Sequence, residues 1–153
     1  MSNRDFDSFV AGAEQRLRRA LVASYGPVIG RDATVDALSW AWEHWDRLRV
    51  MENPVGYLYR VGQTASGRYL STSATESYHA PPPGNSPESE PELAGALGRL
   101  SVQQRAVVVL VHGYAMSQRE AADVMGISVS TVREHLDRGM GRLRSELEVS
   151  HGY

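Results

Sequence analysis

The sequence predicts an all-α protein made of two small helical domains joined by a flexible linker. Along most of its 153 residues, apolar side chains recur at spacings of three and four, which is the period of amphipathic helices. A segment rich in proline, serine and glutamate (residues 71–91) interrupts this pattern. Such a composition is typical of a flexible linker. We therefore expect an N-terminal domain over 1–70 and a C-terminal domain over 92–149.

The N-terminal domain is expected to begin with two amphipathic helices. The first covers residues 5–22 and ends at the breaker Tyr25-Gly26-Pro27. The second is predicted to run from about 32 to 49, with the acidic and aromatic residues Asp36, Trp40 and Glu43 facing outward. The residues expected on its buried face are Val35, Leu38, Ala41, Trp42, Trp45 and Leu48.

A third helix is predicted over residues 54–70, because Asn53 suits the cap and Pro54 the first helical position. Leu58, Val61 and Ala65 are expected to be buried. The side chains expected on its other faces are Tyr59, Arg60, Gln63, Thr64, Arg68 and Tyr69. Gly62 and Gly67 each cost about 1 kcal/mol relative to alanine, so this helix is either closely packed or not selected for stability alone.

The C-terminal domain is expected to end in a helix-turn-helix over residues 116–147. A short helix around Leu93–Leu100 and a helix opened by the capping box Ser101/Gln104 come first. Ser117 and Glu120 form a second capping box, and Gly126 suits the sharp end of that helix. The residues predicted to form the buried stripe of the last helix are Val129, Val132, Leu136, Met140, Leu143 and Leu147. Polar side chains between them leave an outward face of the kind that contacts DNA.

The composition excludes several other classes of function. There is no cysteine, so disulfides, thiolate metal sites and thiol nucleophiles are excluded. The five histidines lack metal-ligand spacing, and no catalytic set or phosphate loop is found, so we expect no metal, no cofactor and no enzymatic activity. The chain has no apolar run long enough to span a membrane and no signal sequence, so we expect a cytoplasmic protein without membrane insertion. A net charge of −2 argues against non-specific coating of nucleic acid.

The order of these parts resembles a bacterial sigma factor of the extracytoplasmic-function group, and the resemblance covers nearly all of the chain. In the C-terminal domain it rests on Leu100 to Leu110 and on the helix-turn-helix from Ser117 to Arg144. In the N-terminal domain, residues 53–61 (NPVGYLYRV) resemble the family's Pro-x-x-Trp-Leu-Tyr-Arg-Val segment. Residues 32–42 fall where the family has its polymerase-clamp helix.

The resemblance implies a sigma factor that binds core RNA polymerase and directs promoter-specific transcription initiation, with an anti-sigma factor as a further candidate partner. The N-terminal domain would correspond to sigma region 2, and the C-terminal domain to sigma region 4. The side chains expected at polymerase are Asp32, Asp36, Trp40 and Glu43. Those expected at the −10 DNA are Tyr59, Arg60, Gln63 and Arg68. Those expected at the −35 element are Ser128, Ser130, Thr131, Arg133, Glu134 and Arg138, with Arg119 and Arg142 on the DNA backbone.

Two alternatives belong to other classes of binding protein. Residues 131–136 (TVREHL) also match the Thr-Val-x-x-His-Leu pattern of LuxR-like regulators, although the segment over 57–61 (YLYRV) has no role there. The other alternative is a diverged sigma-like interaction protein that opens promoters weakly. Its motivation is the serine and threonine that follow the third helix, where the family has a basic tail.

Overall fold

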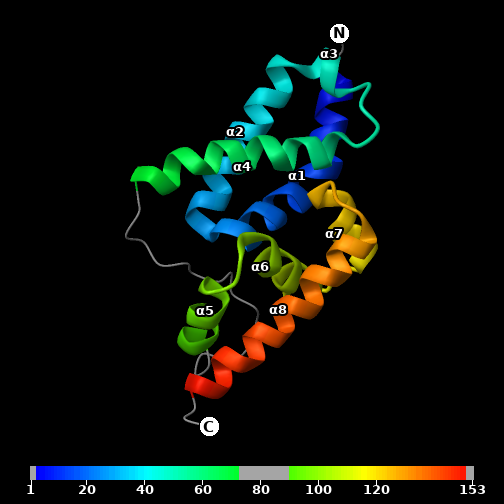
Figure 1. The fold of residues 1–153 in the computed structure, drawn as a ribbon. Coiled ribbons are helices and arrows are strands. Elements are labelled where there is room, and N and C mark those ends of the chain that lie inside the picture. Colours follow the sequence, from blue (N-terminus) through cyan, green and yellow to red (C-terminus); the bar gives the residue numbers. More distant parts are fainter. Residues whose placement is uncertain (1–2, 73–89, 151–153) are drawn as a thin grey trace.

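The computed structural model describes residues 3–72 and 90–150, and within these ranges all the regular elements are helical, which confirms the all-α prediction. Four helices form the N-terminal domain and the remaining elements form the C-terminal domain (Figure 1). The bounds of the N-terminal helices are α1 Asn3–Tyr25, α2 Pro27–Glu43, α3 Trp45–Leu48 and α4 Pro54–Thr72. Those of the C-terminal elements are α5 Glu90–Gly98, α6 Val102–Val108, the π-helix η1 Val109–Gly113, α7 Gln118–Met125 and α8 Val129–Ser150. The predicted linker falls largely outside the described residues.

The second helix begins five residues earlier than predicted. Gly26 takes a positive φ of 90°, which ends α1, and Pro27 then occupies the start of α2. Proline suits that position, because its fixed φ is helical and its missing N–H would have had no helical partner. The helical path is interrupted again at His44, so the predicted single helix to residue 49 is divided into α2 and α3.

The buried face of α2 differs from the prediction. Val35 and Trp42 were expected in the core, but 63% and 44% of their surface is exposed. The face that packs on α1 and α4 carries Ala33 and Ala37 together with Ala41, which was predicted there. Trp45 and Leu48, now in α3, are buried as predicted. The approach is close: a Cβ added at Gly30 would lie 2.5 Å from the backbone of Val22. Small side chains therefore determine the orientation of α2, and Val35 and Trp42 are left outside.

Helix α4 crosses the N-terminal domain and contacts both α1 and α2 (Figure 1). Its start confirms the predicted cap, since the amide of Gly56 donates to Asn53 Oδ1 at 3.1 Å. Leu58 and Ala65 are buried as expected. A Cβ added at Gly62 would lie 2.6 Å from Leu21 Cδ1, so this glycine permits the close crossing of α4 over α1.

The C-terminal domain is organised by α8, which packs against α5, α6 and α7. The capping box Ser101/Gln104 is present at the start of α6, as predicted. Gly139 is buried where α8 passes α6, and a Cβ added there would lie 2.9 Å from Val108 Cγ2. Because Gly139 has no side chain, α8 and α6 can approach each other closely.

The two domains pack directly on each other. Helix α1 contacts α6, η1 and α7, and α4 contacts α7. We call this contact region the interdomain seam. Figure 1 shows α7 between the N-terminal helices and α8. Buried apolar residues of both domains belong to one continuous cluster that crosses the seam. Among the described residues, none of the helices is both long enough and apolar enough to cross a membrane.

Candidate nucleic-acid interface

The turn between α7 and α8 is built by local hydrogen bonds. The Ser117 hydroxyl accepts the Glu120 amide at 3.0 Å, and the Ser117 amide donates to the Glu120 carboxylate at 3.1 Å. This backbone hydrogen bond is the main cause that lowers the pKa of Glu120 below its usual value. Gly126 has the left-handed φ of 67° that ends α7, and the Ile127 amide returns to the Ala122 carbonyl at 3.0 Å. The predicted helix-turn-helix is therefore present.

The first turn of α8 is held by serine and threonine hydroxyls. Ser128 Oγ accepts the Thr131 amide at 3.1 Å and lies 2.8 Å from the Thr131 hydroxyl. Ser130 Oγ is 3.1 Å from the same Ser128 oxygen. Ser128 therefore serves as the cap of α8, and part of its hydrogen-bonding capacity is used within the chain. Thr131 is half-buried, whereas Ser128 and Ser130 are exposed.

Exposed polar side chains follow this turn along one side of α8. Arg133, Glu134 and Arg138 are all exposed, as are the predicted backbone-contacting residues Arg119 and Arg142. Glu134 and Arg138 form an ion pair of 3.0 Å across one helical turn. Arg133, Arg119 and Arg142 have no hydrogen-bond or ion-pair partner within the described part of the chain. Of these three, Arg133 lies nearest the start of α8, and its guanidinium donors are available for an external acceptor.

The exposed side of α4 carries a second polar surface. Arg60, Thr64 and Arg68 are exposed at helical spacing, and Gln63 is half-buried at the edge. Tyr59, which we expected at DNA, is only 2% exposed and is directed into the core. The structure thus contradicts its assignment to DNA contact in this conformation. The face of α4 that remains accessible is an arginine and threonine surface.

A buried hydrogen bond explains the position of Tyr59. The Ser24 hydroxyl donates its proton to the Ala20 carbonyl at 2.7 Å, so the Tyr59 hydroxyl, 2.7 Å away, must be the donor to Ser24 Oγ. Burial is the largest cause that raises the pKa of Tyr59 well above its ordinary value of 10. Tyr59 is therefore a structural residue that joins α4 to the end of α1.

The predicted polymerase-facing residues on α2 do not all lie at the surface. Asp32 and Glu43 are exposed, and Asp36 is half-buried. Trp40 was expected to face outward, but it is half-buried, with its ring stacked on His44 at 4.2 Å and 5.3 Å from the Tyr57 ring.

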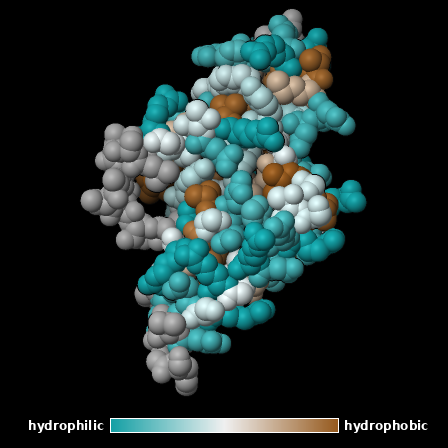
Figure 2. All heavy atoms as spheres, in the orientation of Figure 1, coloured by the Kyte–Doolittle hydropathy of each residue, from teal (hydrophilic) through white to brown (hydrophobic). Residues whose placement is uncertain are grey.

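The exposed apolar residues of α2 are ones that sequence reasoning missed. Val28, Val35 and Trp42 are exposed at intervals of seven residues, which places them along one side of the helix beside Asp32. This spacing was visible in the sequence. Trp42 also contacts Phe6 at a ring distance of 5.1 Å. The face shown in Figure 2 is mostly hydrophilic, with apolar residues in small separate patches.

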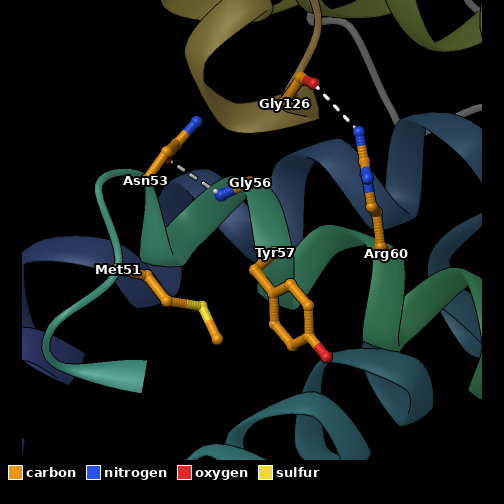
Figure 3. Close-up of a pocket in the computed structure, with 6 residues that line it drawn as sticks. All are labelled: Met51, Asn53, Gly56, Tyr57, Arg60 and Gly126. Atoms are coloured by element: carbon orange, nitrogen blue, oxygen red, sulfur yellow. Dashed lines mark hydrogen bonds between the residues drawn. The ribbon is translucent and has the colours of Figure 1, made fainter. Parts of the chain in front are cut away.

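A pocket of about 210 Å³ lies where the two domains meet. Figure 3 shows its lining, with Asn53, Gly56 and Arg60 from the start of α4 and Gly126 from the helix-turn-helix. Met51 and Tyr57 complete the lining. The Arg60 guanidinium donates to the Gly126 carbonyl at 3.4 Å, and Asn53 Nδ2 donates to the Asp123 carbonyl at 2.8 Å. The start of the polar surface on α4 therefore lies beside the turn that leads into the polar surface on α8.

Comparisons with known proteins identify the family. Residues 91–143 match the family model described as "Sigma-70, region 4", a span that contains the helix-turn-helix. The RNA polymerase sigma-E factor of Streptomyces coelicolor is 30% identical over 94% of this chain and 86% of the relative. The sigma-E factor of Streptomyces avermitilis is 32% identical with the same coverage. The chain belongs to the extracytoplasmic-function group of RNA polymerase sigma factors.

The fold of this sigma factor is also found in a solved structure. It resembles the sigma factor RpoE of Bartonella quintana, solved in complex with the anti-sigma factor NepR, with a TM-score of 0.63 and 22% identity. The match covers 95% of this chain and 98% of that one. Because the sigma-E relatives match across both domains, the sigma-factor interpretation is favoured over a LuxR-like regulator, whose likeness is confined to the helix-turn-helix.

Proposed function

We propose that this sigma factor binds core RNA polymerase and directs it to promoters through two separate DNA-contacting surfaces. The α8 surface would enter the major groove of the −35 element, and the exposed side of α4 would contact the −10 DNA. The observation that carries the proposal is the complete helix-turn-helix with Arg133 exposed and unpaired among the described residues. The role is one of binding rather than catalysis, and it would be exercised in the cytoplasm.

Within the −35 surface we assign base recognition to Arg133 and the polar start of α8. A guanidinium can donate two hydrogen bonds to guanine, which is worth about 1–3 kcal/mol of discrimination. Glu134 is better explained as the ion-pair partner of Arg138, because their 3.0 Å contact holds both side chains along the helix surface. Arg119 and Arg142 suit phosphate contacts, since they are exposed and flank this surface.

The polymerase-binding surface is assigned to the exposed side of α2. Asp32 and Glu43 supply negative charge there, and Val35 and Trp42 supply accessible apolar area. Asp36 lies at the edge of this surface, whereas Trp40 is held against His44. An acidic and apolar helix face fits a basic protein surface with apolar contacts. A partner that covers this face would compete with polymerase, which is how an anti-sigma factor would act on this chain.

The proposal is tested by run-off transcription with core polymerase and a library of −35 sequences. Wild-type protein should give promoter-specific transcripts, and Arg133→Ala should lose preference at one base pair of the −35 element. Arg144→Ala is the matched control, because this exposed arginine lies about 16 Å further along α8 and should leave the base preference unchanged. Polymerase binding without transcripts would instead support the interaction-protein alternative. Failure to bind polymerase would refute both.

A further inference from the structure

Four aromatic side chains connect the core of the N-terminal domain to the exposed side of α2. The Phe6 ring lies 5.1 Å from the Trp42 ring and 5.4 Å from the Trp45 ring. The Phe9 ring lies 5.2 Å from the Trp45 ring. Phe6 and Phe9 come from one face of α1, because residues three apart are neighbours on a helix surface. Figure 1 shows α3, which carries Trp45, beside the N-terminal end of α1.

The two tryptophans of this aromatic cluster differ in burial. Trp45 is only 5% exposed, and its Nε1 atom is buried without a hydrogen-bond partner among the described residues. Its position therefore depends on ring packing against Phe6 and Phe9. Trp42, near the end of α2, keeps 44% of its surface exposed and is covered on one side by Phe6. Phe6 thus joins the exposed tryptophan to the buried one.

The surroundings of Trp42 suit an anchor for a protein partner. Trp42 lies on the side of α2 that we assign to polymerase, with Glu43 next to it and Val35 seven positions earlier. Tryptophan is enriched among the residues that dominate binding energy at protein interfaces. A large side chain that rotates freely loses this freedom when a partner binds, whereas a side chain that is already held loses less. The contact with Phe6 therefore bears on how tightly this surface binds.

We propose that Trp42 is the anchor of the polymerase-binding surface, and that Phe6 is a positioning residue that holds the Trp42 indole in its binding orientation. The inference rests on the proposed function, because it uses the assignment of α2 to core polymerase. Phe6 is half-buried against both indoles, so it acts through Trp42. The partner surface would combine positive charge with an apolar recess that receives an indole.

The chain offers a matched set of substitutions for this test. Phe6→Leu removes the ring that contacts Trp42 and keeps an apolar side chain. Phe6→Tyr keeps the ring, and its hydroxyl can reach water because the side chain is half-buried. Phe9→Leu is the matched control: it makes the same change on the same helix face, and its ring contact within the described residues is with Trp45 and not with Trp42.

The first measurement is the affinity of each protein for core RNA polymerase. Trp42→Ala should weaken binding at least about thirtyfold, as expected for an interface anchor. Phe6→Leu should weaken it about fivefold, while Phe6→Tyr and Phe9→Leu should stay within about twofold of wild type. Equal weakening by Phe6→Leu and Phe9→Leu would overturn the inference, because a shared loss of stability would then explain both. Wild-type affinity in Trp42→Ala would overturn it as well.

A double-mutant cycle separates positioning from direct contact. With Trp42→Ala already present, Phe6→Leu should change the affinity by less than about twofold, because the side chain that Phe6 positions is gone. If the fivefold loss persists in this background, Phe6 contributes to binding independently of Trp42. That result would overturn its role as a positioning residue.

The orientation of Trp42 is measured in the free protein by NMR. The indole N–H signal of Trp42, identified by its absence in Trp42→Ala, lies close to the Phe6 ring and should shift in Phe6→Leu but not in Phe9→Leu. An unmoved signal in Phe6→Leu would contradict the positioning role. If wild-type protein does not bind core polymerase, the proposed function fails, and the role of Trp42 at polymerase fails with it. The indole signal still decides whether Phe6 holds Trp42.

Sedimentation of the free protein tests the other occupant of this face, a second copy of the chain. We expect wild type and Trp42→Ala to sediment alike as monomers. Self-association of the wild type that is lost in Trp42→Ala would assign the exposed indole to a contact between copies, and it would overturn the inference.

Discussion

Substitution of Arg105 by methionine is expected to separate the unfolding of the two domains. Arg105 is only 8% exposed, and its Nε and Nη2 atoms donate to the Ser24 carbonyl at 3.0 and 2.6 Å across the seam. Its Nη1 atom lies 3.4–3.5 Å from the carbonyls of Leu97, Gly98 and Leu100 at the end of α5. One guanidinium thus joins the C-terminal ends of α1 and α5. Methionine has a comparable length but no donor.

The expected loss in the free energy of unfolding follows from the hydrogen bonds that Arg105→Met removes. A hydrogen bond to a charged group contributes about 1.5–3 kcal/mol, and the Ser24 carbonyl would lose both of its bonds to this side chain. The three contacts of 3.4–3.5 Å are near the limit of hydrogen bonding and add little. We therefore expect Arg105→Met to lower the free energy of unfolding by about 2–3 kcal/mol.

The assay uses the distribution of chromophores along the chain. The three tryptophans (Trp40, Trp42 and Trp45) all lie in the N-terminal domain, so their fluorescence reports its unfolding, whereas far-UV circular dichroism reports both domains. In urea, the two signals of the wild type should change together. In Arg105→Met the midpoint should fall by about 1 M, given slopes of about 1–3 kcal/mol per molar, and the two transitions should separate.

Arg99→Met is the control for the loss of an arginine in the same domain. Its ion pair with Glu146 is 3.4 Å long and lies at the surface, where such pairs contribute at most about 1 kcal/mol. A loss below about 1 kcal/mol in Arg105→Met, with coincident transitions, would refute the proposed coupling through Ser24. Separate transitions already present in the wild type would refute it as well.

Three further predictions concern stability within each domain. Because burial raises the pKa of Tyr59, the unfolded chain releases this proton first, so wild-type stability should fall as pH rises above about 10. Tyr59→Phe should remove that part of the slope in urea midpoints measured at about pH 8 and 10.5; an unaltered slope would exclude Tyr59 as its source. Gly139→Ala should lower the melting temperature, because the added methyl group meets Val108 Cγ2 at 2.9 Å. Gly141→Ala, whose added methyl group meets nothing within 4 Å, should stabilise the protein by about 1 kcal/mol. Equal changes of melting temperature in Gly139→Ala and Gly141→Ala would contradict this account. Ser117→Ala should cost about 1 kcal/mol in urea unfolding by removing the cap of α7, and Ser117→Asp should recover most of it.

Features encoded by neighbouring residues could be predicted from the sequence. The capping boxes at Ser101 and Ser117, the helix end at Gly126 and the buried stripe of α8 each depend on residues within a few turns. Their chemistry is therefore visible in a single stretch of sequence. This is why the helix-turn-helix, and with it the family, could be predicted without coordinates.

Features that depend on distant partners could not be predicted in the same way. Tyr59 was placed at the surface because its partner Ser24 is 35 positions away. The buried face of α2 was misjudged because large apolar residues were given precedence over alanines, whereas the close crossing of helices selects small side chains. Arg105 contacts a main-chain carbonyl 81 positions earlier, an acceptor that every residue carries and no sequence pattern marks.

The chemistry of the seam also bears on how this chain can vary during evolution. Asn53, Arg60 and Arg105 act as donors through their side chains, while Ser24, Asp123 and Gly126 accept through the main chain. A main-chain acceptor survives almost any substitution at its own position, so the side chain of Asp123 is free to drift without affecting this contact. The donors have no such freedom. In an alignment of close relatives, these hydrogen bonds would therefore constrain the donor positions and leave Asp123 free, whereas Gly126 and Ser24 are constrained by the end of α7 and by the Tyr59 hydroxyl.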